Sequence, residues 1–146
     1  MFIKLTNGVP ENYTIGQLRK DNLNVSFPKD IPLETLASYN VYPLTVADRP
    51  SYNRLIEDAV LNTPTEVNGA WIQSYSVVQK PQEDAERNIR NRRNNLLLES
   101  DWTQVADAPV DQTAWATYRQ SLRDITAQEG FPFNVTFPTQ PIVLIG

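Results

Sequence analysis

The chain has no cysteine and no histidine among its 146 residues. Without cysteine there is no disulfide bond, no thiolate nucleophile and no cysteine-bound zinc. Without histidine the chain lacks the commonest general base and the commonest metal ligand. Any chemistry would depend on carboxylates, hydroxyls, lysines and tyrosines. We therefore expect a protein that is not an enzyme and that holds no cofactor and no metal ion.

Glycine is also scarce, with 5 residues, whereas proline is frequent, with 11. The sequence contains no glycine-rich phosphate-binding pattern and no acidic calcium-binding loop. Because prolines interrupt helices and strands, we expect short elements joined by stiff, extended connections. A phosphate-binding enzyme is not indicated.

The chain has neither a positive net charge nor a long apolar run. Its formal net charge is -4 at pH 7, and an acidic chain does not attract the phosphate backbone of nucleic acids. The most apolar run, residues 141–145, is far shorter than the roughly 20 residues that cross a bilayer. Residues 1–8 show no secretion signal. We expect a soluble, cytoplasmic protein whose partner is neither nucleic acid nor a membrane.

What the chain does contain is compatible with a folded core. Hydrophobic residues make up 40% and charged residues 21% of the sequence, as in ordinary globular domains. The patterns described below predict an α+β fold in three regions. These are an N-terminal α+β region at residues 1–80 with a β-hairpin at about 52–80, a helical hairpin at 81–130, and an extended apolar tail at 131–146.

Two short helices are predicted in the N-terminal region. Thr14 and Gln17 have the spacing of a capping box, which predicts a helix that ends at residues 21–22. Pro32 suits the first turn of a second helix at residues 33–38. This second helix is expected to bury its apolar residues Leu33, Leu36 and Ala37.

Strands are predicted on either side of these helices. Residues 2–5 alternate between apolar and polar, as a half-buried strand does. Asn40 is expected to be a left-handed cap that leads into a strand at residues 41–46. That strand contains Pro43, and because proline cannot donate to a sheet, we expect the strand at a sheet edge.

A β-hairpin is predicted between two better strands, residues 52–62 and 70–80. Asn68 and Gly69 form the dipeptide that favours a tight hairpin turn just before the second strand. On the second strand one face carries Trp71, Gln73, Tyr75 and Val77. Trp71 and Tyr75 on this strand are candidates for contact with a partner.

The most distinct helix begins after Pro81 and runs to about Glu99. Acidic residues in its first turn favour the positive end of the helix dipole. Its apolar stripe consists of Ala85, Ile89, Leu96 and Leu97. Its arginines, Arg87, Arg90, Arg92 and Arg93, are interpreted as a solvated face with local pairs such as Glu83 with Arg87, in preference to a nucleic-acid patch. Carboxylates cluster at its two ends, where capping explains them better than a two-carboxylate hydrolase does.

A second helix is predicted at residues 112–125 with Asp111 as its N-cap. Its apolar residues Trp115, Tyr118, Leu122 and Ile125 form one stripe, which needs a partner. The stripe of the preceding helix is the nearest, so an antiparallel helical hairpin is expected.

Aromatic and basic residues gather around this second helix, at Trp102, Trp115, Tyr118, Arg119 and Arg123. Trp, Tyr and Arg are the residues most enriched at binding hot spots. Since Arg119 and Arg123 are four residues apart, they are expected on one flank. In the alternative interpretation, which is preferred for Trp115, the tryptophans fill the core between the helices. The arginines would then pair with Asp101, Asp107 or Asp124.

The tail ends in the apolar residues Ile142, Val143, Leu144 and Ile145. Such a β-prone run is an aggregation risk if it is left free. Two interpretations stay open: the tail covers its own domain, or it adds as a strand to another protein.

Two motifs stand close together in the chain, Ser-Asp-Trp-Thr-Gln at residues 100–104 and Trp-x-x-Tyr-Arg-x-x-Leu-Arg-Asp at residues 115–124, followed by Gly-Phe-Pro at 130–132. With these motifs, the segment from residue 85 to 138 resembles the phage tail assembly chaperone family. Where the family pattern often has leucine and proline, this chain has Val105 and Ala106. The motif residues of this chain are Asp101, Trp102, Asp107, Trp115, Tyr118, Arg119, Arg123 and Asp124.

The resemblance implies a bacteriophage protein that helps to fold, trimerise or attach a tail fibre or another tail component. We expect a non-catalytic chaperone or adaptor that binds such a component in the host cytoplasm. The alternative is a permanent virion component at the tail fibre, baseplate or collar, and a homo-oligomer is possible in either case. The residues expected to contact the partner are Trp71, Tyr75, Trp102, Tyr118, Arg119, Arg123, Ile142, Val143, Leu144 and Ile145.

Overall fold

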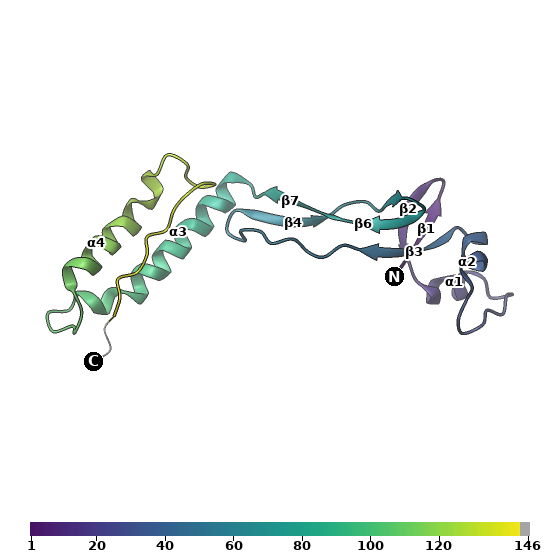
Figure 1. Ribbon diagram of the computed structural model, residues 1–146, viewed down its shortest axis with the longest axis horizontal. Helices are drawn as coiled ribbons and strands as arrows, with labels where there is room; N and C mark the ends of the chain where they lie inside the picture. The colour runs from purple at the N-terminus through teal and green to yellow at the C-terminus, as the bar shows by residue number, and fades with distance from the viewer. Residues whose placement is uncertain (144–146) are drawn as a thin grey trace. The chain divides into compact units, whose positions relative to one another are not determined.

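A computed structural model describes residues 1–143 of the chain, and the predicted contact residues Leu144 and Ile145 lie outside the described residues. The chain divides into two compact units. The first unit comprises Met1–Ser51 and Ala59–Val77, and the second comprises Tyr52–Asp58 and Val78–Gly146. This division differs from the predicted one, in which residues 1–80 formed one region and residues 131–146 a separate tail. Helices and strands occur together (Figure 1), so the predicted α+β class is confirmed.

The first unit contains a five-stranded sheet in the order β2-β1-β3-β6-β5. The strands are β1 (Phe2–Thr6), β2 (Val9–Tyr13), β3 (Val41–Val46), β5 (Thr65–Val67) and β6 (Ala70–Gln73). β3 and β6 pair in parallel, and the other neighbours are antiparallel. β2 was not predicted from the sequence.

Two Asn-Gly turns form the hairpins of this sheet. Asn68 and Gly69 have φ angles of 50° and 80° and join β5 to β6. Asn7 and Gly8 have φ angles of 51° and 79° and join β1 to β2. Positive φ at both central positions is typical of the tight turn that matches the twist of a hairpin. The same dipeptide at Asn7 thus gave a signal for β2 that the sequence analysis did not use.

Pro43 lies in the middle of the sheet, so the prediction that its strand is an edge strand is wrong. β3 pairs with β1 on one side and with β6 on the other. The backbone amide of Leu44 donates to Met1 O at 2.9 Å, which makes Phe2 and Pro43 the neighbouring pair that exchanges no hydrogen bonds. Pairing with β6 begins only at Leu44. The missing N–H of the proline therefore interrupts neither ladder.

Two short helices pack against this sheet, α1 (Ile15–Asp21) and α2 (Leu33–Ser38). The predicted capping box of α1 is confirmed, because Gln17 N donates to Thr14 Oγ1 at 3.1 Å and Thr14 N donates to Gln17 Oε1 at 2.8 Å. In α2 Leu36 is buried as predicted, but Leu33 is 65% exposed. Ile31, from the loop before α2, packs against the cluster that Leu33 was expected to join.

The core of the first unit is small. Its buried residues Tyr13, Leu18, Leu36 and Val41 form one cluster, and Ile3 is fully buried as well. The hydroxyl of Tyr13 donates to Asp21 Oδ2 at 2.7 Å. Burial, together with this hydrogen bond, raises the pKa of Tyr13 to about 12.

β4 (Glu57–Leu61) and β7 (Tyr75–Gln79) form a separate two-stranded ribbon, and the boundary between the two units falls within both strands. Asn62 N donates to Ser74 O at 2.9 Å and Lys80 N donates to Ile56 O at 2.8 Å, so the two strands run in opposite directions. The predicted strand at 52–62 thus begins only at Glu57. The amides of Ile56 and Glu57 both donate to Asn53 O, which holds the preceding residues in a turn. The predicted strand at 70–80 is interrupted at Ser74.

The second unit contains α3 (Gln82–Glu99), the 3-10 helix η1 (Asp101–Gln104), α4 (Gln112–Arg123) and the 3-10 helix η2 (Asp124–Ala127). The predicted N-cap Asp111 is confirmed, since its carboxylate accepts from Ala114 N at 3.0 Å. No helix within residues 1–143 is long and apolar enough to cross a membrane. The stripe of α4 is buried as predicted, and it packs with α3 in two clusters that contain Ile89 and Ile125, and Leu96, Trp115, Tyr118 and Leu122.

Residues 131–137, here called the strap, return along α3 and α4 without forming a strand (Figure 1). Alternate strap residues, Phe131, Phe133, Val135 and Phe137, pack against the cluster that contains Ile89 and Ile125. Gly130 precedes the strap at a point where a Cβ would lie 2.2 Å from Asn134 O, so only glycine fits there. This part of the predicted tail therefore covers its own unit.

Candidate partner-binding site

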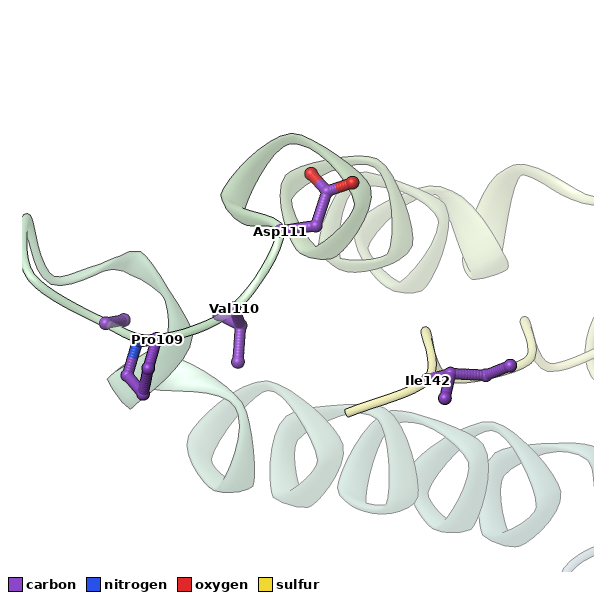
Figure 2. A pocket seen from close by; sticks show the side chains of 5 residues that line it. Pro109, Val110, Asp111 and Ile142 are labelled. Atoms are coloured by element: carbon purple, nitrogen blue, oxygen red, sulfur yellow. The ribbon is translucent and has the colours of Figure 1, made fainter. Parts of the chain in front are cut away.

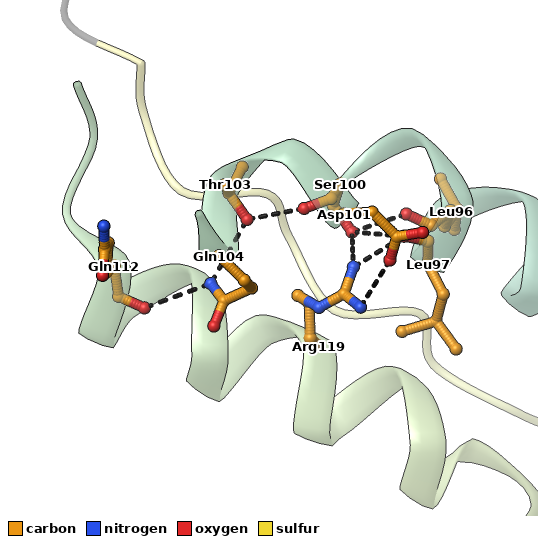
Figure 3. A network of polar contacts seen from close by, with 8 residues as sticks. All are labelled: Leu96, Leu97, Ser100, Asp101, Thr103, Gln104, Gln112 and Arg119. Atoms are coloured by element: carbon orange, nitrogen blue, oxygen red, sulfur yellow. Dashed lines mark hydrogen bonds and ion pairs between the residues drawn. The ribbon is translucent and has the colours of Figure 1, made fainter. Parts of the chain in front are cut away.

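The inter-helix turn, residues 100–111, connects α3 to α4 and is fixed by one buried arginine (Figure 3). Arg119 is 8% exposed. Its Nη1 donates to Leu97 O at 2.6 Å and to Ser100 Oγ at 2.8 Å, and its Nη2 donates to Asp101 Oδ1 at 2.7 Å. One planar guanidinium thus satisfies a carbonyl at the end of α3, a hydroxyl and a carboxylate.

Further side-chain hydrogen bonds hold the turn from within. Ser100 Oγ donates to Leu96 O at 2.7 Å, and Thr103 Oγ1 donates to Ser100 O at 2.6 Å. Gln112 Nε2, at the start of α4, donates to Val105 O at 2.7 Å. Ser100 and Thr103 are both buried. The turn is therefore bonded to the end of α3 and to the start of α4.

Three aromatic rings, one from the turn and two from α4, contact one another in series. Trp102 and Trp115 have ring centroids 6.4 Å apart, and Trp115 meets Tyr118 edge to face at 5.4 Å. Trp115 and Tyr118 are each 4% exposed, whereas Trp102 is 46% exposed. Trp115 Nε1 and Tyr118 Oη are buried without a hydrogen-bond partner among the described residues, so ring packing, not polar contact, holds these two side chains. Trp102 is the outer ring of the series.

Three large apolar side chains in and next to the inter-helix turn are exposed. Leu98 is 72% exposed and Val105 is 53% exposed, and both are close in sequence to Trp102. Large apolar side chains that stay in water on a rigid turn are typical of a surface that another protein covers. We call Leu98, Trp102 and Val105 the turn surface.

All charged residues between positions 98 and 111, which include the turn surface, are acidic. Asp101 is bound to Arg119, and the carboxylate of Asp111 caps α4. Glu99 and Asp107 are exposed and form no ion pair within residues 1–143. Residues 98–111 contain no lysine and no arginine. The charges within residues 98–111 are thus all negative, and the guanidinium of Arg119 is a positive charge bound among them.

A pocket of about 420 Å³ lies beside the turn, between its last residues and the tail (Figure 2). Ala108, Pro109, Val110 and Asp111 line it from the turn, and Ile142 lines it from the tail. Ile142 is nevertheless 85% exposed, and Val143 is 43% exposed. The end of the described tail therefore adds apolar surface next to the turn.

The strap is anchored by one glutamine. Gln128 Nε2 donates to Thr136 O at 2.8 Å, and Thr136 N donates to Gln128 Oε1 at 2.8 Å. The side-chain amide thus pairs with both backbone groups of one strap residue, as a neighbouring strand would. This contact fixes the strap against the residue that follows η2.

The predicted contact residues fall into three groups. Trp102, Ile142 and Val143 are exposed at or near the turn, and Arg123 is exposed on α4. Tyr118 and Arg119 are buried. The expectation that Arg119 shares an exposed flank with Arg123 is therefore wrong, because the end of α3 accepts its guanidinium, and the alternative pairing with Asp101 is correct. Trp71 and Tyr75 are half-buried and belong to the first unit.

Sequence reasoning missed Leu98, Val105, Glu99 and Asp107 as surface candidates. A signal was present, because Leu98 lies off the apolar stripe of α3 and the whole turn lacks basic residues. The local pairs predicted on α3 exist with other partners. Arg87 pairs with Asp84 at 2.9 Å instead of Glu83. Arg90 pairs with Glu86 at 3.2 Å, and hydrogen bonds from Gln82 and then Arg90 lower the pKa of Glu86.

Comparison with known proteins gives one match. No curated protein and no solved structure matches the chain. Within residues 1–143, no group of three or more acidic side chains is placed to hold a metal ion. Residues 86–142, which include α3 from Glu86 onward, the inter-helix turn, α4 and the strap, match the family model of the phage tail assembly chaperone protein, and the family predicted from the motif is thereby confirmed for this segment.

Proposed function

We propose that the protein binds a component of a phage tail during assembly in the host cell, without catalysis, and that the turn surface makes the contact. The observation that carries this proposal is the exposure of Leu98 at the end of α3 and of Trp102 and Val105 on the adjoining turn, which buried hydrogen bonds hold rigid. The turn lies inside the segment that matches the family. The family match supports a tail assembly role, and the exposure of the three apolar side chains supports the choice of surface.

Rigidity makes this surface suitable for binding. A turn that is already ordered loses little conformational entropy when a partner covers it. Trp102 rests with one side against Trp115 and leaves nearly half of its surface free. An exposed, preorganised tryptophan is typical of a hot spot, where truncation costs about 2 kcal/mol or more of binding free energy.

The proposal is tested with the tail proteins of the same phage, each co-expressed with this chain and co-purified. We expect Leu98→Ser and Trp102→Ala to weaken the complex at least about tenfold, while circular dichroism shows an unchanged fold. Leu23→Ser is a matched control, because Leu23 is 85% exposed in the first unit. Equal weakening by the control, or none by the two variants, contradicts the assignment of the turn surface.

A second candidate is a permanent virion component at the tail fibre, baseplate or collar. The exposed Ile142 and Val143 favour it, since apolar residues beside a pocket are best covered by a lasting partner. Mass spectrometry of purified virions separates the two candidates. A transient chaperone is absent from mature particles, whereas a structural component is present in fixed stoichiometry.

A further inference from the structure

We infer that the partner segment at the turn surface is basic as well as apolar, presenting lysine or arginine beside at least one large apolar side chain. The inference rests on the proposed function and adds the chemistry of the partner. It is drawn from the distribution of charge around Leu98, Trp102 and Val105.

Helix α3 carries carboxylates and guanidinium groups together, whereas residues 98–111 carry carboxylates only. Along α3, Asp84 pairs with Arg87 and Glu86 pairs with Arg90. Around the turn surface four carboxylates, those of Glu99, Asp101, Asp107 and Asp111, are exposed, and residues 98–111 offer no cation. Arg119 is the cation that reaches the turn, and its guanidinium is occupied by Asp101 and by two oxygens of the α3 end.

This arrangement selects the charge of a partner. Glu99 follows Leu98 directly in the chain and Asp107 is two residues from Val105, and neither carboxylate has an ion pair in the described part of the chain. An acidic segment would meet like charges, which is costly when water is displaced, whereas a basic segment is attracted. Electrostatic complementarity therefore favours cationic side chains around the apolar contact.

Trp102 supports the same choice. Its ring is 46% exposed, and the face of a tryptophan ring attracts a guanidinium or an ammonium group. The aliphatic stems of arginine and lysine also cover apolar surface while their charged ends stay near water. One basic side chain can thus contact the ring of Trp102 and a carboxylate of the turn together.

The test uses overlapping synthetic peptides that span the tail proteins of the phage, immobilised and probed with the intact protein. We expect the bound peptides to carry a positive net charge together with a large apolar residue. Their binding should weaken several-fold between low and physiological salt, as attraction between exposed charges is screened. Bound peptides that are neutral or acidic would overturn the inference and leave the proposed function intact. If the protein binds no peptide and no intact tail protein, the proposed function fails as well.

A double variant that replaces two carboxylates by neutral amides makes the test specific to the turn. We expect Glu99→Gln with Asp107→Asn to weaken binding of the basic peptides about tenfold and to flatten the salt dependence. The control, Glu83→Gln with Glu129→Gln, removes the same charge from exposed positions outside the turn. Neither turn residue has a described partner, and Glu99 opposes the helix dipole at the end of α3, so loss of folding is not expected. Equal weakening by both pairs overturns the inference.

Discussion

The two units of this protein are stabilised in different ways. In the first unit the backbone pairs with itself through a five-stranded sheet and two Asn-Gly turns. In the second unit side chains reach backbone groups far away in sequence, as Arg119 does at the end of α3 and Gln128 does on the strap. Backbone ladders tolerate many side chains, whereas such contacts require particular residues. The second unit is also the one with a detectable family.

Several residues of the motif that indicates the family fix the inter-helix turn. Ser100 and Asp101 accept the guanidinium of Arg119, and Trp102 packs on Trp115. Thr103 bonds back to Ser100. These motif residues therefore specify the shape of the turn, and the partner contact proposed above lies at residues that this shape leaves exposed, Trp102 among them.

The largest expected effect tests whether the two units are independently stable. Leu18 and Leu122 are both fully buried, one in each unit. We expect Leu18→Ala and Leu122→Ala each to reduce the free energy of unfolding by about 2–5 kcal/mol. Hydrogen exchange should show lost protection only in the unit that carries the substitution. Loss of protection in both units would mean that they unfold together.

Removal of the arginine that fixes the turn comes next. Arg119→Met should reduce the free energy of unfolding of the second unit by about 2–3 kcal/mol, since it removes the three hydrogen bonds that the guanidinium donates to Leu97 O, Ser100 Oγ and Asp101 Oδ1. Arg123→Met removes the same charge from an exposed position and should change it by less than about 0.5 kcal/mol. Thermal unfolding of the two variants provides the comparison, and equal melting temperatures would contradict the structural role of Arg119.

The strap gives a smaller effect. Gln128→Ala removes two hydrogen bonds to Thr136 and should cost about 1–2 kcal/mol of local stability. Hydrogen exchange at the amides of residues 134–137 should accelerate, while α4 stays protected. Gln120→Ala, which removes an exposed contact with Asp124, is the control. An unchanged strap in Gln128→Ala would show that apolar packing alone holds it.

The smallest effect concerns the first unit at high pH. The folded pKa of Tyr13 is about 12, against 10.0 for an unperturbed tyrosine. Because folding raises this pKa, the contribution of neutral Tyr13 to the free energy of unfolding is complete below pH 10. This contribution is lost as the pH rises from 10 toward 12. Tyr13→Phe should remove this part of the alkaline destabilisation, measured by circular dichroism across that range. An identical pH profile in the variant would contradict the assignment.

Local signals in the sequence predicted much of this fold. The caps at Thr14 and Asp111 and the apolar stripes of α3 and α4 depend on residues a few positions apart, so the sequence shows them directly. The left-handed Asn40 was predicted for the same reason and has a φ of 58°. Each of these features is decided within one turn or one helix.

What could not be predicted depends on residues far apart in the chain. The order of the strands placed Pro43 at the centre of the sheet, and no local pattern reveals which strands become neighbours. Helical spacing correctly put Arg119 and Arg123 on one flank of a helix, but it did not show that the end of α3 lies opposite only the first of them. The exposed turn surface was missed because exposure, too, is decided by such long-range packing.

The division of the chain has a consequence for its synthesis. Ile56 and its neighbour Leu55 belong to the core of the second unit, together with the strap at residues 131–137. A chain that grows from its N-terminus can finish the sheet of the first unit once β6 has been made. Leu55 and Ile56, in contrast, reach their final packing only after the strap has been made. The turn surface is thus presented on a finished support only after nearly all of the described chain has been made. A nascent or truncated product that lacks the strap would leave more of Leu55 and Ile56 exposed.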